Sequence, residues 1–235
     1  MGINVKFCIH KDFMGVFPDP VPARKVLPDF FSRMPPLTNK SDRLTPTVKK
    51  CVPFLDALSI GYIIPLWLDM NVSIAESEYN ITFPRNSPWP DPIGTHSQEQ
   101  LNGHPRNKDI MGDVNLKLNN PWIIETPKGY SCLFTSPLNR LEKRFKVLDA
   151  IVDTDKYYNP INFPFLWTGG LGDFFIPKGT PFMHVIPFKR ETASFSVVEQ
   201  NEKKKETFSK KLSTVFLDGY RNLSWHKSKE NKGDI

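Results

Sequence analysis

Two groups of polar residues follow apolar runs in the third quarter of the chain, and one of them contains a side chain that could bind an anion. The first group is Ser136, Asn139 and Arg140; the second is Asp153, Asp155 and Tyr157. A guanidinium such as that of Arg140 can bind a phosphate through two hydrogen bonds, although an Arg near a strand end is often simply solvated. Asp side chains hydrogen-bond their own backbone at strand ends, so a turn role is the alternative for both carboxylates.

A second set of residues could bind a metal. An oxygenase-type iron site needs two His and a carboxylate at convergent positions. In a cupin-like double-stranded β-helix, His96 with Glu99 or Asp91 could meet His184. The spacing lacks the close His-x-Asp or His-x-His start of such sites, and histidines satisfied in a loop or in the core are the alternative. We therefore expect no metal site, with His96 and His184 as the weak candidates.

Motifs for other chemistry are missing from the sequence. There is no GxSxG, P-loop or GxGxxG pattern. The glycine-rich stretch 168–172 lies between expected strands and opens no helix, so it lacks the helix N-terminus that a phosphate cradle needs. The sequence identifies no cofactor.

Short strands must position these residues. The 22 Pro and 13 Gly in 235 residues favour many short elements. Apolar or alternating runs are interrupted about every ten residues by turn formers, which is typical of an all-β unit. The strands we expect are 5–9, 61–72 (interrupted at Pro65), 77–83, 116–126, 130–134, 145–152, 161–167, 173–176 and 182–187.

Helical patterns occur mainly outside this β region. Short helices are expected at 29–34 and 49–58. An amphipathic helix is predicted after residue 198, where apolar residues recur at three- and four-residue steps, and we expect it to dock on the sheet or on a neighbouring subunit. The predicted domains are a Pro-rich basic segment packed on the core (1–50), an all-β core (51–191), and a C-terminal helix with a charged tail (192–235).

Composition restricts partners and location. The hydrophobic fraction of 39% supports one sizeable core. The net charge of +6 favours anionic partners or a solvated Lys-rich surface. The sequence has no stripe of basic residues interleaved with aromatic ones, so it does not indicate nucleic-acid binding. The three Cys form no CxxC pair.

The N-terminus has no signal-peptide core, and no apolar run is long enough to span a bilayer. We expect a cytoplasmic, intracellular or virion-associated protein that is neither secreted nor membrane-bound.

The order of motifs from 121 to 191 resembles the dUTPase and dCTP-deaminase superfamily, whose fold is the β-clip. Pro-Lys-Gly-Tyr at 127–130 is similar to the family's first turn, and Ser-Pro-Leu-Asn-Arg at 136–140 lies where its phosphate-binding segment falls. Ala-Ile-Val-Asp-Thr-Asp at 150–155 and Asp-Phe-Phe-Ile-Pro-Lys-Gly at 173–179 are similar to the later motifs. The resemblance implies that Asp153 orients or activates the attacking water, a reasonable role for a general base, and that the protein is a homotrimer.

The chain departs from this pattern at several points. Lys156 displaces the stacking Tyr by one position, to Tyr157, which reverses the face of a strand on which it lies. The Ser-Gly of the phosphate segment is missing, and a charged helix replaces the family's glycine-rich C-terminal arm. These departures argue against pyrophosphatase activity. The segments PKGYSCLFT, VDTDKY, INFPF and IPKGTP with VIPFKRE also resemble a family of bacterial and tailed-phage proteins, to which we attach no activity.

We therefore predict a mostly β fold, β-clip-like or a related barrel or sandwich. The first hypothesis for function is a non-catalytic or much-altered β-clip protein that binds a small anionic ligand, in particular a nucleotide, near Asp153, Tyr157, Asn139 and Arg140. The alternatives are a phage structural or assembly protein that uses the same loops for subunit contacts, and a metal-dependent, cupin-like β-barrel enzyme.

Overall fold

The computed structural model describes residues 2–40, 43–76, 78–85, 87–89, 91–101, 103, 114–215 and 219–225. The predicted mostly β fold is confirmed, because strands far outnumber helical segments of any length. The described strands form five separate antiparallel sheets and no closed barrel. Within this part of the chain, no helix combines the length and apolar character that a membrane span requires.

The chain divides into two compact units. A β unit consists of Ile3–Leu27 and Leu58–Arg190, and a second, basic unit consists of the first two residues, Pro28–Ala57 and Glu191–Ile235. The three-part division expected from the sequence stays a prediction.

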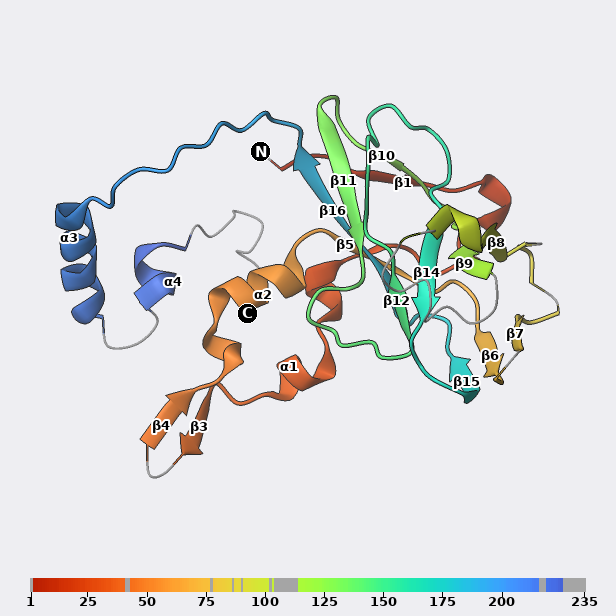
Figure 1. The fold of residues 1–235 in the computed structure, drawn as a ribbon, viewed down its shortest axis with the longest axis horizontal. Coiled ribbons are helices and arrows are strands. Elements are labelled where there is room, and N and C mark those ends of the chain that lie inside the picture. The colour runs from red at the N-terminus through yellow and green to blue at the C-terminus, as the bar shows by residue number, and fades with distance from the viewer. Residues whose placement is uncertain are drawn as a thin grey trace. The chain divides into compact units, whose positions relative to one another are not determined.

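The largest sheet of the β unit is built around strand β11. Its order is β13-β11-β16-β5-β2, and Figure 1 shows β11, β16 and β5 running beside one another. These strands are β13 (Ala150–Val152), β11 (Tyr130–Thr135), β16 (Pro181–Lys189), β5 (Tyr62–Pro65) and β2 (Val21–Pro22). Since β11 pairs with β13 on one side and β16 on the other, residues that follow either partner meet its start.

Three smaller sheets complete the unit. The four-stranded sheet has the order β12-β14-β9-β8, the three-stranded sheet β15-β6-β7, and β1 pairs with β10. Their bounds are β12 (Phe145–Val147), β14 (Phe163–Trp167), β9 (Val114–Leu118), β8 (Ile93–Ser97), β15 (Gly172–Ile176), β6 (Met70–Ile74), β7 (Tyr79–Thr82), β1 (Lys6–Cys8) and β10 (Ile123–Glu125). Short 3₁₀ helices occur at η1 (Lys11–Phe13), η2 (Ala23–Val26) and η4 (Gln98–Leu101).

Aromatic side chains join these sheets into one core. Phe182 of β16 is fully buried and stacks on Phe145 of β12, with ring centroids 4.7 Å apart. Phe165 of β14 meets the Phe182 ring edge-on at 5.6 Å. Full burial of one such side chain stabilises the fold by about 1.5–3 kcal/mol, and a ring pair adds roughly 1 kcal/mol. Because Phe145 also lines the cavity described below, this packing supports one wall of the site.

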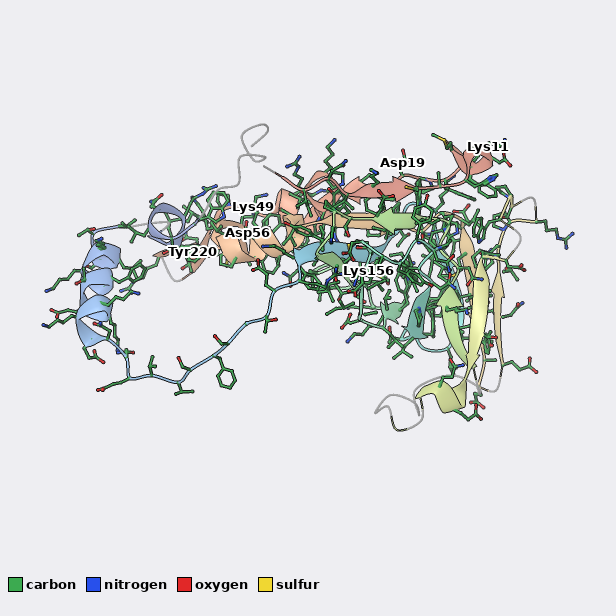
Figure 2. All side chains as sticks on the ribbon, turned by 90° about the horizontal axis from the view of Figure 1, so that it is seen from above. Lys11, Asp19, Lys49, Asp56, Lys156 and Tyr220 are labelled. Carbon is green, nitrogen blue, oxygen red and sulfur yellow. The ribbon has the colours of Figure 1, made fainter. Side chains whose placement is uncertain are left out.

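The basic unit contains the remaining elements. They are α1 (Asp29–Arg33), the hairpin of β3 (Leu37–Lys40) and β4 (Arg43–Pro46), η3 (Val48–Lys50), α2 (Val52–Ser59), which continues into the β unit, α3 (Glu202–Ser213) and α4 (Gly219–Leu223). Lys49, labelled in Figure 2, donates from Nζ to the carbonyl oxygens of Phe31 at 2.8 Å and Ser32 at 3.0 Å. Asp56, also labelled, accepts from Trp225 Nε1 at 3.0 Å.

Three expected elements are divided differently. The segment 145–152 was predicted as one strand, but β12 and β13 lie in different sheets because the chain changes direction at Leu148 and Asp149. The segment 116–126 likewise splits into β9 and β10. The C-terminal helix is two helices, α3 and α4, with no buried residue in either, and Phe216 of its predicted apolar face lies outside the described residues.

Candidate functional site

The turn after β13 holds the two predicted carboxylates. Asp153 directly follows the strand, and its carbonyl oxygen accepts from the backbone N–H groups of Lys156 and Tyr157, both at 2.9 Å. The backbone of Asp153 therefore forms a turn, which is the alternative role that the sequence suggested for this residue. Tyr157 is about half exposed, and its hydroxyl accepts from Asn159 Nδ2 at 3.2 Å.

Asp155 is bound by Arg190, which follows β16. The guanidinium makes a two-fold contact with the carboxylate, from Nη1 to Oδ1 at 2.8 Å and from Nη2 to Oδ2, and the Gly129 N–H donates to Oδ2 at 2.8 Å. The Asp155 side chain is only 1% exposed. The pKa of Asp155 is lowered to about 2, mainly by the hydrogen bond from Arg190 and next by that from the Gly129 N–H. With its oxygens occupied, this carboxylate fixes the Gly129 turn to the end of β16.

Asp153 is the more accessible of the two, with 51% of its side chain exposed. Its Oδ1 accepts from the Ser131 hydroxyl at 2.7 Å and lies 3.0 Å from Arg190 Nη1. The Ser131 hydrogen bond and the Arg190 charge lower the pKa of Asp153 below its usual value. A general base works best when its pKa lies near the operating pH, so this lowering weakens Asp153 as a base.

The other predicted residues lie at the opposite end of β11. Ser136 Oγ accepts from the Val147 N–H at 3.0 Å. Arg140 donates to the carbonyl oxygens of Val26 and, at 3.4 Å, Ala23. Burial lowers the pKa of Arg140. These bonds commit the guanidinium to the segment around η2.

The two groups of predicted residues do not converge within one chain. Ser131 contacts Asp153, whereas Ser136 begins the other group five residues later. Five residues of extended strand span about 17 Å. The structure thus brings together Asp153, Asp155 and the adjacent turn with Tyr157, and separately Ser136, Asn139 and Arg140.

A cavity of about 330 Å³ lies beside the second group. It is lined by Ser136, Pro137, Leu141, Glu142, Phe145, Lys146 and Thr168. The lining residues include two with hydroxyls, one carboxylate, one ammonium and three that are apolar. A concave site with a few polar groups on an apolar lining is typical of small-molecule binding.

The two charged groups of the cavity differ in their partners. Glu142 accepts from Arg144 Nε at 2.9 Å and Nη2 at 2.8 Å. Although burial alone raises it, the hydrogen bonds from Arg144 bring the pKa of Glu142 below its usual value. Lys146 is exposed and has no carboxylate partner among the described residues. Its ammonium group is available to a ligand.

The loop that forms one wall of the cavity has unusual backbone geometry. Asn139 and Leu141 adopt φ values of 56° and 55°, in the left-handed region that L residues rarely occupy. Leu141 is 79% exposed. Such strain persists where the surroundings hold it, and it is enriched at functional sites.

His184 holds this loop from the core side. Its Nδ1 accepts from the Leu138 N–H at 3.3 Å, so Nε2 carries the proton and donates to the Ile60 carbonyl oxygen at 2.5 Å. Burial lowers the pKa of this imidazole, which keeps it neutral. Both ring nitrogens are therefore used, which leaves none for a metal. The His96 side chain lies outside the described residues.

A metal site of three or more His, Cys, Asp or Glu side chains is not found in the described part of the chain. The sequence interpretation missed Arg190, Glu142 and Lys146. Arg190 is 35 residues from Asp155, and only the pairing of β11 with β16 brings it near, so no local pattern indicates it. Lys146 could have been found from its position, since it alternates with the apolar Phe145 and Val147 on β12.

No protein-family model and no curated protein sequence matches the chain. Similar solved structures are dUTPases. One is a mutant dUTPase from phage phi11 of S. aureus, with 12% identity, a TM-score of 0.34, and coverage of 61% of this chain and 86% of that one.

Two further dUTPases have similar values. The native EIAV dUTPase has 11% identity and a TM-score of 0.34 over 71% of this chain and 92% of that one. A mutant dUTPase of Staphylococcus bacteriophage 80alpha with dUpNHpp has 13% identity and a TM-score of 0.35 over 86% of this chain and 90% of that one. At TM-scores this low, the likenesses do not bear on the residues of the site.

Proposed function

We propose that the chain binds a small anionic ligand, in the first instance a nucleotide, in the cavity beside the Ser136–Leu141 loop. The observation that carries the proposal is the free ammonium of Lys146 in a cavity whose wall contains the left-handed Leu141. Of the ligand-binding residues expected from the sequence, Ser136 belongs to this site. Arg140 holds its loop through the carbonyl oxygens of Val26 and Ala23, and Asn139 lies on this loop outside the lining.

Each lining group has a distinct task. Lys146 supplies the positive charge for a phosphate. The Ser136 hydroxyl donates only weakly to the Val147 carbonyl oxygen, at 3.5 Å, so it can turn to a phosphate oxygen, whereas the Thr168 hydroxyl donates to the Lys143 carbonyl oxygen at 2.7 Å and is already used. Pro137 and Leu141 offer apolar surface for a flat ring. The ionised Glu142 accepts hydrogen bonds only, so it suits a sugar hydroxyl or a ring N–H of the ligand.

The proposal is for binding without hydrolysis at this cavity. Asp153, the expected base, is next to Ser131, about 17 Å along β11 from Ser136. Of the described residues, Glu142 is the one carboxylate that lines the cavity, and it is paired with Arg144. A water held between a base and a phosphate has no evident place here.

The test is a thermal-shift and calorimetry screen with nucleotides, with and without divalent cations. A ligand at 100 times its Kd should stabilise the fold by about 2.7 kcal/mol, which raises Tm by about 5 °C or more in a chain of this size. Lys146→Met should lose most of the shift. Lys156→Met is the matched control, since Lys156 lies on the turn after β13 (Figure 2). No shift with any compound, or equal shifts in both variants, would overturn the proposal.

A subunit contact is the second candidate function, favoured by the free edge of β13. Among the described strands it pairs with β11 alone, and Ile151 on it is 64% exposed, with Tyr158 67% exposed just beyond. Exposed strand edges with apolar side chains favour pairing with another chain. We therefore also propose a homo-oligomer that forms through this edge. Sedimentation velocity of Ile151→Lys, compared with the unaltered chain, tests the proposal. If the two proteins sediment with the same mass, this edge is not the subunit contact.

A further inference from the structure

We infer that the cavity selects a ligand with a single phosphate, such as a nucleoside monophosphate, over the corresponding diphosphate and triphosphate. The inference rests on the proposed function and deepens it. It follows from the number of free positive charges that the cavity offers.

Only one cation of the site is uncommitted among the described residues. Arg144 uses Nε and Nη2 on Glu142 and donates from Nη1 to the Phe175 carbonyl oxygen at 3.1 Å. Arg140 is committed to the carbonyl oxygens of Val26 and Ala23. Lys146 remains, with one unit of charge and three donors.

The charge of the ligand must match this supply. A phosphate monoester carries about −1.5 to −2 at pH 7, because its second pKa is about 6. The ammonium of Lys146, with its three donors, and the hydroxyl of Ser136 can satisfy such a group, while the Thr168 hydroxyl is used by the Lys143 carbonyl oxygen. Each further phosphate adds negative charge that no second cation offsets and that faces the ionised Glu142.

A bound Mg²⁺ does not offset the negative charge of these further phosphates. Mg²⁺ with nucleotide phosphates usually takes one or two protein carboxylates. Within the described part of the chain, Glu142 is the one carboxylate that lines the cavity, and both of its oxygens accept from Arg144. A metal-bound triphosphate would therefore have to displace that pair.

The size of the cavity agrees with a single-phosphate ligand. Its volume of about 330 Å³ is near the lower end of the roughly 300–1,000 Å³ typical of small-molecule pockets. One base, one sugar and one phosphate make a ligand of the right order. A triphosphate chain would extend into solvent without further contacts from the lining.

The experiment is titration calorimetry on the full chain with two series, one of adenine and one of uracil: nucleoside, monophosphate, diphosphate and triphosphate, each with and without Mg²⁺. We expect the monophosphate to bind at least tenfold more tightly than the nucleoside and the triphosphate. Lys146→Met should reduce monophosphate affinity to that of the nucleoside, and Lys146→Arg should largely keep it. Leu141→Lys, which adds a second cation to the lining, should shift the preference toward the diphosphate.

The outcomes separate this inference from the proposed function. If no compound of either series binds, the proposed function fails and the inference with it. If the triphosphate binds as tightly as the monophosphate, or more tightly, the proposed function survives and the single-phosphate selection is wrong. Equal affinities for nucleoside and monophosphate would also overturn the selection, since the phosphate would then not be recognised.

Discussion

The left-handed backbone at Leu141 makes a prediction in which stability and binding change in opposite directions. Leu141 has φ 55° and is 79% exposed, so replacing it by Gly removes strain and little packing. A left-handed L residue costs roughly 1–2 kcal/mol, and the extra chain entropy of Gly returns about 0.5–1 kcal/mol of that. Leu141→Gly should therefore raise the free energy of unfolding by about 0.5–1 kcal/mol. In a chain of this size Tm rises by about 1–4 °C.

The same substitution should weaken ligand binding. A ligand in the cavity covers part of the exposed Leu141 side chain, and full burial of a Leu is worth about 1.5–3 kcal/mol. Losing about half of that gain corresponds to roughly a fivefold to tenfold higher Kd. Urea unfolding gives the first quantity and calorimetry with the best ligand of the screen gives the second.

Asn139→Gly provides the matched control. Asn139 has nearly the same φ, 56°, but does not line the cavity, and Asn tolerates the left-handed region better than Leu. Its replacement should leave stability and Kd nearly unchanged. Destabilisation by Leu141→Gly would show that the side chain packs more than its exposure indicates. An unchanged Kd in Leu141→Gly would show that Leu141 is not a wall of the site.

Three further predictions concern groups that hold the β unit together. Gly61→Ala should lower stability by about 3 kcal/mol and Tm by about 6–12 °C, measured by calorimetry, because φ is +66° and a Cβ would lie 2.2 Å from the Val185 carbonyl oxygen. Asp155→Asn should lower Tm at neutral pH by weakening the Arg190 contact, and the difference should shrink as pH falls toward the Asp155 pKa of about 2. The neutral imidazole of His184, with its lowered pKa, stabilises the fold fully above pH 6.5, so Tm should fall with pH below that value, and His184→Gln should lose this pH dependence.

Strand positions in this chain follow from local sequence, and the boundaries show why. The predicted strands 130–134, 173–176 and 182–187 match β11, β15 and β16 within one or two residues. Alternating apolar residues and flanking turn formers act over a few positions, so a local pattern detects them. The break inside 145–152 escaped because Leu148 and Asp149 carry no Gly or Pro to mark the change of sheet.

The partners of the site residues are set by contacts between distant parts of the chain, which local sequence patterns do not contain. Arg140 is a plausible phosphate ligand from its type, yet its charge goes to carbonyl oxygens of a segment more than 110 residues away. The partner of Asp155, likewise, is set by the register of β11 against β16 rather than by the residues around it. Ser136 lines the cavity, and its role as a ligand-binding residue stays a prediction. The alternation of Lys146 with buried Phe145 and Val147 on β12 is a local pattern that points to an outward-facing Lys146.

The geometry of β11 explains why similar motif order need not produce a similar site. The first motif of the stretch, Pro127 to Tyr130, enters this strand, and the segment from Ser136 leaves it, so the two flank opposite ends. Asp153 follows β13 and lies beside the entry end of β11, because the two strands are antiparallel. A ligand that touches both groups in one chain would have to extend about 17 Å along the strand. The entry end instead closes on itself through Arg190 and Asp155, and the exit end keeps the only uncommitted cation of the cavity, at Lys146, among the described residues. Under the proposed function the ligand therefore binds at the exit end, beside Lys146 and the left-handed Leu141.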